Sequence, residues 1–424
     1  MYTLKTNQLW KPYCAALALT LLPAAGRADV VLDWNAIMQN TVSSQPAFPQ
    51  ARIAAITQLA VFEAVNAITK EYKPYLGTVT APDNASVEAA AAQAAHDVLK
   101  NYFPTNASGL DAALATSLST IPEGAPKASG IASGQAAAAA MIAARANDGS
   151  SPSEFYLPSS SEPGVWQPTP SCTAAGGAFY QWKDITPFVL LSGSQFRLGP
   201  PPLLTSGRYT VAFDEVELVG GQTSTMRPQD RANVALFYAA VTPVGVFNDV
   251  YRQISTAQSL SVVENAHNLA LLGLAINDAA IATFDSKYHY NFWRPETAIH
   301  NTSDTGNNLT VADPSWTPFI VTPCFPSYPA AHGALSNAAA TVLEQILGNA
   351  RFSVSLSNAA VPGVVLTYNN FTEITDDISD ARVYGGIHFR TDQDAGASLG
   401  QKVGQYVYAH SLNPRNARAG CGDQ

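Results

Sequence analysis

The pattern of apolar and polar positions along the chain is mostly that of buried helices. Apolar residues lie nearly all round a helix over residues 49–68, which opens with a proline. Alanine-rich stretches with few helix breakers span residues 86–103 and 127–146. The same periodicity continues in the rest of the chain, over residues 228–240, 262–284, 329–347 and 379–410. The sequence therefore predicts a predominantly helical protein.

Strand patterns are sparse, and the clearest pair lies at residues 352–356 and 361–368, around Pro362-Gly363. We therefore expect an all-α fold of one or more helical bundles with a minor β-hairpin. From residue 147 to about residue 208 the helical pattern gives way to Pro, Gly and Ser with scattered aromatic residues. Such a long irregular segment in a compact protein is typical of a functional wall or lid.

The first residues have the pattern of a secretory signal peptide. Lys5 and Lys11 precede an apolar run over residues 13–22, and the small-residue site Gly26-Arg27-Ala28 follows. The run is shorter than the roughly 20 residues that a membrane-spanning helix needs. We expect residues 1–28 to be removed and the protein to be secreted or periplasmic. The rest, residues 29–424, is predicted to be one domain with its catalytic half at about residues 260–410.

Composition narrows the classes of partner. The chain is 47% hydrophobic and only 13% charged, which excludes intrinsic disorder, and its formal charge is −9. An acidic balance argues against nucleic acid and anionic membrane surfaces, since both are bound through excess Lys and Arg. The most apolar later run, residues 269–282, is interrupted by Asn277 and Asp278, so no membrane span is expected. Cys172, Cys324 and Cys421 permit one disulfide, with three possible pairings.

Residues suited to chemistry concentrate in three segments of the C-terminal third. In the first, two cations lie seven residues apart, about two turns, so they can project from one face of a helix. In the second, a proline-rich stretch leads into a His in the first turn of the next helix, where free N–H groups favour an anion. In the third, a His and an Asp four residues apart can share a helix face. The residues concerned are Lys287 and Arg294, then His332, then Arg382, His388 and Asp392.

Together the three segments resemble the signature of the vanadium-dependent haloperoxidase and type 2 phosphatidic-acid phosphatase superfamily. That signature is Lys, six residues and Arg-Pro; then Pro-x-x-His; then Arg, five residues, His, three residues and Asp. The secreted bacterial chloroperoxidase-related branch is the more similar, through Phe-Pro-Ser-Tyr-Pro over residues 325–329 and through residues 33–35 and 62–68. The resemblance implies helical bundles of the vanadium haloperoxidase type.

The resemblance also implies roles for individual residues. A tetrahedral oxyanion, either vanadate or phosphate, would be bound through its oxygens by Lys287, Arg294, Arg382 and the backbone at Ala331. His388 would be the axial ligand of vanadate, or the nucleophile that becomes a phosphohistidine. His332 would act as acid and base on the opposite side, with Asp392 behind the site and with Phe284 and Phe325 as the wall of a halide pocket.

The chain departs from the family pattern at two places. Ala330-Ala331 stands where the family usually has Ser-Gly, and Ala381 stands where it usually has Ser before the Arg. Two hydroxyl donors to the anion are therefore absent, and each hydrogen bond to a charged group is worth about 1.5–3 kcal/mol. Backbone N–H donors, three cations and a His remain, so the departures bear on affinity and turnover more than on the existence of the site.

Three functions follow from these residues. A haloperoxidase would oxidise halide with hydrogen peroxide at the bound vanadate, a secreted acid phosphatase would use a phosphohistidine, and a degenerate protein would only bind an oxyanion. The scarcity of oxidisable side chains in the exported chain, with Met only at residues 38, 141 and 226, favours the first. An oxidant-producing site also requires that Cys324, beside Phe325, be buried or in a disulfide. A homo-oligomer is compatible with each function.

Overall fold

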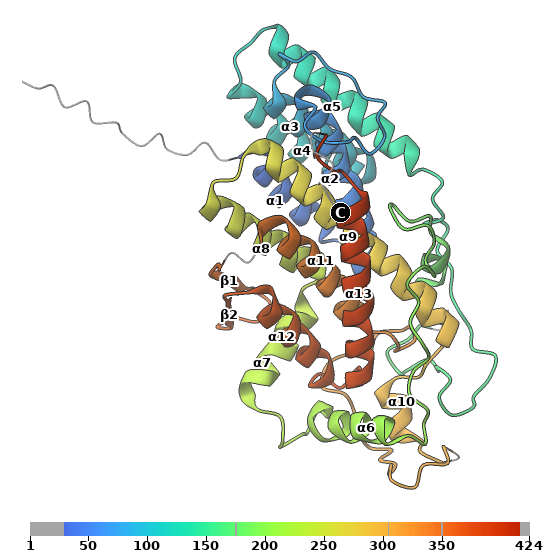
Figure 1. Cartoon of the computed structure of the whole chain (residues 1–424). Helices are drawn as coiled ribbons and strands as arrows, with labels where there is room; N and C mark the ends of the chain where they lie inside the picture. Colours follow the sequence, from blue (N-terminus) through green and yellow to red (C-terminus); the bar gives the residue numbers. More distant parts are fainter. Residues whose placement is uncertain (1–28, 174–175, 304, 349–350, 416–424) are drawn as a thin grey trace, which may run out of the picture.

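A long helix, α9 (Val262–Tyr290), runs through the middle of the computed structural model, which describes residues 29–173, 176–303, 305–348 and 351–415 (Figure 1). Ser261 begins the helix through a capping box with Glu264, in which each side chain bonds the other residue's backbone N–H. The helix is buried over most of its length because it packs against α2 (Ala47–Thr69), α11 (Ala331–Leu347) and α13 (Arg390–His410). It therefore joins the N-terminal helices to the C-terminal ones.

Small residues bring the N-terminal helices close together. These helices are α1 (Val30–Val42), α2, α3 (Val87–Tyr102) with the short η1 (Pro104–Asn106), α4 (Ala107–Ser119) and α5 (Ala125–Ala144). On α5, a Cβ at Gly134 would stand 2.6 Å from the carbonyl oxygen of Ala90 on α3. Only glycine permits such an approach of two backbones, so the alanine-rich pattern reflects close helix packing.

The pair α11 and α13 is packed in the same way, and this pairing positions the candidate site. A Cβ at Gly396, Gly400 and Gly404 of α13 would stand 2.4, 2.1 and 2.8 Å from three carbonyl oxygens of α11, those of Ala330, Ala334 and Ala338. Since the residue numbers increase in the same direction along both helices at these three contacts, the two helices run parallel. Their N-terminal ends lie side by side, where Ala330 donates its N–H to the carbonyl oxygen of Asp392 at 2.9 Å.

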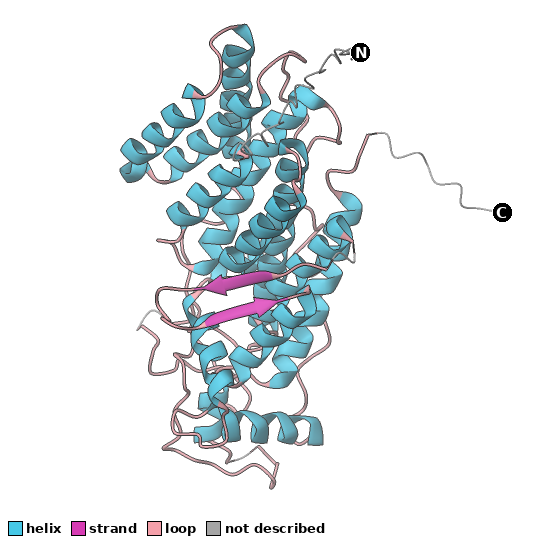
Figure 2. Cartoon of the chain, turned by 90° about the vertical axis from the view of Figure 1, so that its left-hand side faces the viewer, coloured by secondary structure: helices cyan, strands magenta, loops and turns pink. Residues whose placement is uncertain are grey.

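The remaining elements surround this core. They are the short helix η2 (Tyr180–Asp184) and the helices α6 (Gly207–Gly220), α7 (Gln229–Ala240), α8 (Pro243–Gln258), α10 (Pro295–His300) and α12 (Phe371–Val383). One antiparallel hairpin lies on the side of the bundle (Figure 2). Its strands, β1 (Val354–Ser357) and β2 (Val365–Tyr368), pair with Val354 opposite Tyr368. The all-α fold with a minor hairpin is thus confirmed.

The helix expected over residues 379–410 is wrong as a single element. It is two helices, α12 and α13, separated by residues 384–389. Gly386 adopts φ +80°, and a Cβ there would stand 2.3 Å from the carbonyl oxygen of Gly220. The chain therefore turns here because the end of α6 meets its backbone directly. The pattern also failed to reveal α1, α4, α6, α8 and α10 as separate helices.

The irregular segment between α5 and α6 is fastened to the core. The carboxylate of Asp278, in the middle of α9, accepts three successive backbone N–H groups at 2.7–2.9 Å, those of residues 188–190. Of the three possible cysteine pairings, the structure contains the Cys172–Cys324 disulfide, which confirms that Cys324 is not a free thiol. Cys421 lies outside the described residues, as does the expected signal peptide, residues 1–28.

Two helices in the described part of the chain, α2 and α9, are long and apolar enough to cross a membrane by length and composition. The bent pair α7 and α8 passes the same test if it is taken as one span. This finding differs from the expectation that no later segment is apolar enough. However, 94% of the most apolar window of both α2 and α9 is buried inside the protein. Packing against neighbouring helices therefore accounts for the apolar character of these two helices.

Candidate active site

Lys287 and Arg294 lie close together, as predicted, but they do not project from one helix. Lys287 lies in the last turn of α9, but α9 ends at Tyr290, and Asn291 has a left-handed φ of 48°. Arg294 therefore precedes α10 and does not share a helix face with Lys287. Both cations nevertheless lie over the ring of Phe325, with Lys287 Nζ 5.2 Å and Arg294 Cζ 5.0 Å from its centre.

Backbone carbonyls of the proline-rich loop hold these two cations in place. Lys287 Nζ donates to the carbonyl oxygens of Pro326 at 2.7 Å and Ser327 at 2.8 Å. Arg294 donates from Nε to the carbonyl oxygen of Phe325 at 2.8 Å and from Nη1 to that of Ile387 at 2.9 Å. Because both side chains are fully buried, these bonds fix the direction in which their remaining N–H groups point.

The third segment contributes a buried histidine with a supporting carboxylate. His388 lies before α13 and Asp392 in its first turn, so the two do not share a helix face as predicted. They still meet, with His388 Nδ1 3.0 Å from Asp392 Oδ2. Ser327 donates its hydroxyl to the same carboxylate oxygen at 2.5 Å, and Arg294 Nη1 lies 2.9 Å from His388 Nε2. Since a guanidinium only donates, we assign the proton of His388 to Nδ1 and the lone pair to Nε2.

His332 and Arg382 complete the set. His332 lies in the first turn of α11, as predicted; it is half-buried, and its ring forms a hydrogen bond with the backbone of Val241. Arg382, near the end of α12, is buried and donates from Nη1 to the carbonyl oxygen of Tyr238 at 3.1 Å. Ala331 is the first residue of α11, where backbone N–H groups have no partner within the helix.

Three of these side chains keep a buried nitrogen without any hydrogen-bond partner among the described residues. The atoms are Nη2 of Arg294, Nε of Arg382 and Nε2 of His332. A buried, unpaired polar group costs about 1–3 kcal/mol, and more if it is charged, so these three atoms require a partner from outside the chain, a ligand or water. Two guanidinium groups and an imidazole together suit the oxygens of a small tetrahedral anion. The residues present therefore fit vanadate or phosphate.

The electrostatics of the site also favour an anion. Burial lowers the pKa of Arg294 to about 9 and that of Arg382 to about 10, and it lowers the pKa of Lys287 well below its usual value. Burial, followed by the charges of the three cations, lowers the pKa of both His332 and His388, so both rings are neutral at pH 7. Since the charge of each cation acts on both imidazoles, the five groups lie near one another. A multiply charged anion would stabilise the protonated form of each.

The aromatic residues proposed for a halide pocket occupy different depths. Phe325 is half-buried and lies over the two cations, whereas Phe284 is fully buried behind it, with ring centres 5.3 Å apart. Phe48 and Phe179 extend the same cluster, at 5.9 and 6.3 Å from the ring of Phe325. Phe325 is thus the aromatic residue that faces the cations, and the others support it from the core.

Sequence reasoning missed Ser327 and the carbonyl groups that hold the cations. Ser327 is fully buried and its hydroxyl also lies 3.2 Å from His388 Nδ1, so it touches both members of the His388–Asp392 pair. Its place in the Phe-Pro-Ser-Tyr-Pro stretch, which carries part of the family resemblance, was the available signal. Carbonyl groups carry no signal in a sequence, since every residue has one.

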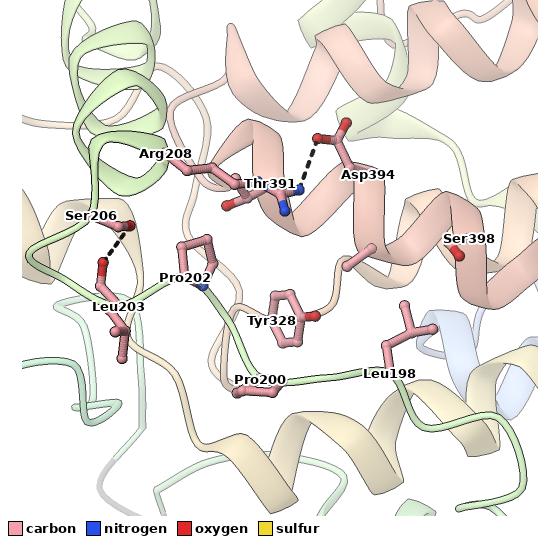
Figure 3. Close-up of a pocket in the computed structure, with 11 residues that line it drawn as sticks. Leu198, Pro200, Pro202, Leu203, Ser206, Arg208, Tyr328, Thr391, Asp394 and Ser398 are labelled. Atoms are coloured by element: carbon pink, nitrogen blue, oxygen red, sulfur yellow. Dashed lines mark hydrogen bonds and ion pairs between the residues drawn. The ribbon is translucent and has the colours of Figure 1, made fainter.

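A cavity of about 440 Å³ opens on the outer side of this region (Figure 3). Tyr328 and Thr391, the chain neighbours of Ser327 and Asp392, line it together with Leu198, Pro200, Pro202, Leu203, Ser206, Arg208, Asp394, Ala395 and Ser398. Arg208 and Asp394 pair across it at 3.6 Å. None of the predicted site residues lines this cavity, so it is separate from the candidate site.

Comparison with known proteins supports the fold described above. Residues 267–417 match the VCPO second helical-bundle domain. A bacterial vanadium-dependent iodoperoxidase of known structure is similar, with a TM-score of 0.75 and 26% identity over 91% of this chain and 96% of that one. The holo form of a bacterial vanadium-dependent chloroperoxidase is similar with a TM-score of 0.70 and 18% identity, over 90% and 92% of the two chains.

No curated protein sequence matches this chain. The matched range contains all six motif residues discussed above, so it spans the whole candidate site. The fold of the solved relatives covers most of the chain as well. The matched domain and the fold shared with the solved relatives support the vanadium haloperoxidase superfamily for this chain.

Proposed function

We propose that the protein is a vanadium-dependent haloperoxidase that uses hydrogen peroxide to oxidise halide at a vanadate bound to His388. The observation that supports this most is the set of buried nitrogens without partners, on Arg294, Arg382 and His332, around a neutral histidine. The solved relatives are themselves vanadium-dependent iodo- and chloroperoxidases. Bound vanadate would supply a Lewis-acidic centre that activates hydrogen peroxide towards halide.

Arg294, Arg382 and Lys287 would hold the oxygens of the anion. The guanidinium of Arg294 is fixed on one side by two carbonyl oxygens, which leaves Nη2 for the ligand. Arg382 likewise keeps Nε, and Lys287 has a third N–H beyond the two that it donates to the loop. Because these donors are already oriented, binding requires little reorganisation of the protein.

His388 would be the ligand of the metal through Nε2. Its neutral form is required for this role, and burial together with the surrounding cations favours that form. The carboxylate of Asp392 holds the Nδ1 proton and so directs the Nε2 lone pair into the site. Burial raises the pKa of Asp392 to about 6, which still leaves the carboxylate mostly ionised at pH 7.

His332 would accept and return a proton on the other side of the anion. Its Nε2 has no partner among the described residues and its ring is neutral at pH 7, so it could accept a proton from hydrogen peroxide and return one to the water that is released. Phe325 would present an apolar surface beside the cations, where halide loses its water shell.

Halogenation and phosphate-ester hydrolysis, measured on one purified sample, test the proposal. With orthovanadate and hydrogen peroxide we expect halogenation of an organic acceptor with iodide, bromide or chloride. Without vanadate we expect no hydrolysis of p-nitrophenyl phosphate. Hydrolysis without halogenation would instead support the acid phosphatase, because the same cations would bind a phosphate group. Vanadate binding without either activity would support the degenerate oxyanion-binding protein.

A histidine substitution locates the activity. His388→Ala is expected to abolish halogenation, while His289→Ala, at an exposed position in the last turn of α9, leaves it unchanged. Retention of activity in His388→Ala would refute the site assignment. Circular dichroism of each variant shows whether the fold is intact, so a loss of activity can be separated from a loss of structure.

We further propose that the protein is exported. The Cys172–Cys324 disulfide supports this proposal, because such bonds persist in oxidising compartments and are rare in the cytosol. Expression with residues 1–28 followed by fractionation of the cells and medium tests it. Cleavage after residue 28 and recovery outside the cytoplasm are expected.

A further inference from the structure

A second cavity, of about 310 Å³, lies where α11, α12 and α13 meet, and it shares Asp394 with the cavity in Figure 3. Polar residues make up most of its lining, and it contains no Lys, Arg or His. The lining residues are Gly333, Asn337, Ala340, Thr341 and Glu344 of α11; Thr372, Thr375, Asp376 and Ser379 of α12; and Gln393, Asp394, Ala397 and Gln401 of α13.

Two carboxylates at the rim of this cavity have no cationic partner. Asp394 pairs with Arg208 on its other side. Glu344 and Asp376, by contrast, form no side-chain hydrogen bond or ion pair with any described residue. The charges of Glu344 and Asp376 are therefore not neutralised by an ion pair, although Arg390 lies beside the lining residue Ser379, and the carboxylates favour a cation at the mouth of the cavity.

An independent observation comes from the cavity wall. The Gln393 side chain is only 1% exposed, yet neither its amide oxygen nor its amide nitrogen has a hydrogen-bond partner in the described part of the chain. Gly333 leaves room for it, since a Cβ at that position would stand 3.0 Å from the Gln393 amide oxygen. An unpaired buried amide destabilises the protein, and a ligand with both a donor and an acceptor would satisfy it.

The chemistry of these groups defines the class of ligand. The rim carboxylates call for a positive charge, and the amide of Gln393 calls for a group that both donates and accepts. Hydroxyl and amide side chains around it, such as Thr341 and Asn337, suit further hydroxyl groups. A bare metal ion fits less well, because the described residues contain no cluster of three metal-binding side chains. We propose that this cavity binds a polyhydroxylated amine of the amino-sugar class.

Calorimetric titration of the full protein with glucosamine tests the proposal. We expect saturable binding to the wild type, and at least tenfold weaker binding of N-acetylglucosamine and glucose, which lack the charge. Gln393→Leu, Glu344→Gln and Asp376→Asn should each weaken glucosamine binding by at least threefold. Glu162→Gln, an exposed acid outside the cavity, serves as the matched control and should bind as the wild type does.

Several outcomes would overturn the proposal. One is the absence of saturable heat with glucosamine at millimolar concentration. Others are equal binding of the uncharged sugars, unchanged affinity in all three cavity variants, or binding of calcium chloride in place of glucosamine. Halogenation plays no part in these measurements, so the result is independent of the proposed function. Folding of each variant is checked by its unfolding temperature.

Discussion

At the scale of single residues, the hydroxyl of Ser327 decides how firmly the site histidine is oriented. It donates to the Asp392 oxygen that also faces His388 Nδ1. This hydrogen bond fixes the position of the carboxylate, and the carboxylate in turn orients the imidazole ring. Removal of such a supporting group typically lowers metal affinity or activity about 10- to 100-fold. The effect belongs to the ligand-binding geometry and leaves the fold in place.

We therefore expect Ser327→Ala to weaken vanadate binding by about 10- to 100-fold, measured by titration of halogenation activity with orthovanadate. Ser336→Ala is the matched control: Ser336 is another fully buried serine, but its hydroxyl has no hydrogen-bond partner among the described residues. Unchanged vanadate affinity in Ser327→Ala would contradict the positioning role, and equal losses in both variants would point to a general packing effect.

The motif residues could be chosen from the sequence because their types and spacing resemble a known signature. Their surroundings could not. The carbonyl oxygens that hold Lys287 and Arg294 come from a loop 39 and 31 residues further along, respectively, and from Ile387, and no side-chain pattern marks them. Residue identity thus predicted which groups meet, and tertiary packing determined how they are oriented.

At the scale of helices, the parallel packing of α11 on α13 sets the distance between the two sides of the site. His332 lies at the start of α11 and Asp392 at the start of α13. The glycines of α13 let the backbones touch, and at Gly400 a Cβ would stand 2.1 Å from the Ala334 carbonyl oxygen. Any side chain there must push the two helices apart.

We expect Gly400→Ala to destabilise the protein by about 1–3 kcal/mol, the usual cost of overpacking, although alanine favours a helix more than glycine does. Gly109→Ala in α4 is the control, because nothing lies within 4 Å of a Cβ at that position. It should be neutral or stabilising. Urea unfolding measures both changes, and equal stability of the two variants would show that the contact relaxes without cost.

Helix boundaries were the least predictable feature at this scale. Residues 379–410 have a continuous helical pattern, and the break at residues 384–389 arises because Gly386 meets the backbone of Gly220, far away in the sequence. The error about a shared helix face at His388 and Asp392 has the same origin, whereas Lys287 and Arg294 are separated by the end of α9, where Asn291 adopts a left-handed φ of 48°. Periodicity describes a helix but not the neighbour that ends it.

At the scale of the whole molecule, a buried ion network ties the N-terminal helices to the irregular segment. Asp148 lies 2.8 Å from Arg52 Nε on α2 and 3.0 Å from Arg145 Nη2, and Arg145 also donates to the carbonyl oxygen of Thr186. Burial alone would raise the pKa of Asp148, but the hydrogen bond and charge of Arg52, assisted by Arg145, outweigh it and lower the pKa below 3.8.

A carboxyl group with a lowered pKa stabilises the folded state above its unfolded pKa, and this contribution is lost as the pH falls through the folded value. We expect Asp148→Asn to cost about 3–5 kcal/mol at pH 7, because two buried cations lose their partner. The difference from wild type should shrink below about pH 4. Urea unfolding between pH 7 and pH 3 measures it, and a difference that does not depend on pH would contradict the charge-based explanation.

The disulfide between Cys172 and Cys324 bears on how many turnovers one molecule survives under the proposed activity. Hypohalous acid attacks thiols readily, and Cys324 is the chain neighbour of Phe325 beside the site. Cys172→Ser, which frees the Cys324 thiol, should inactivate faster during halogenation, with oxidised Cys324 found by mass spectrometry. The double variant Cys172→Ser/Cys324→Ser should last as long as wild type, and equal lifetimes of all three proteins would refute the idea. Under the proposed activity, the disulfide would protect the protein from the oxidant that it makes and would lengthen its working life.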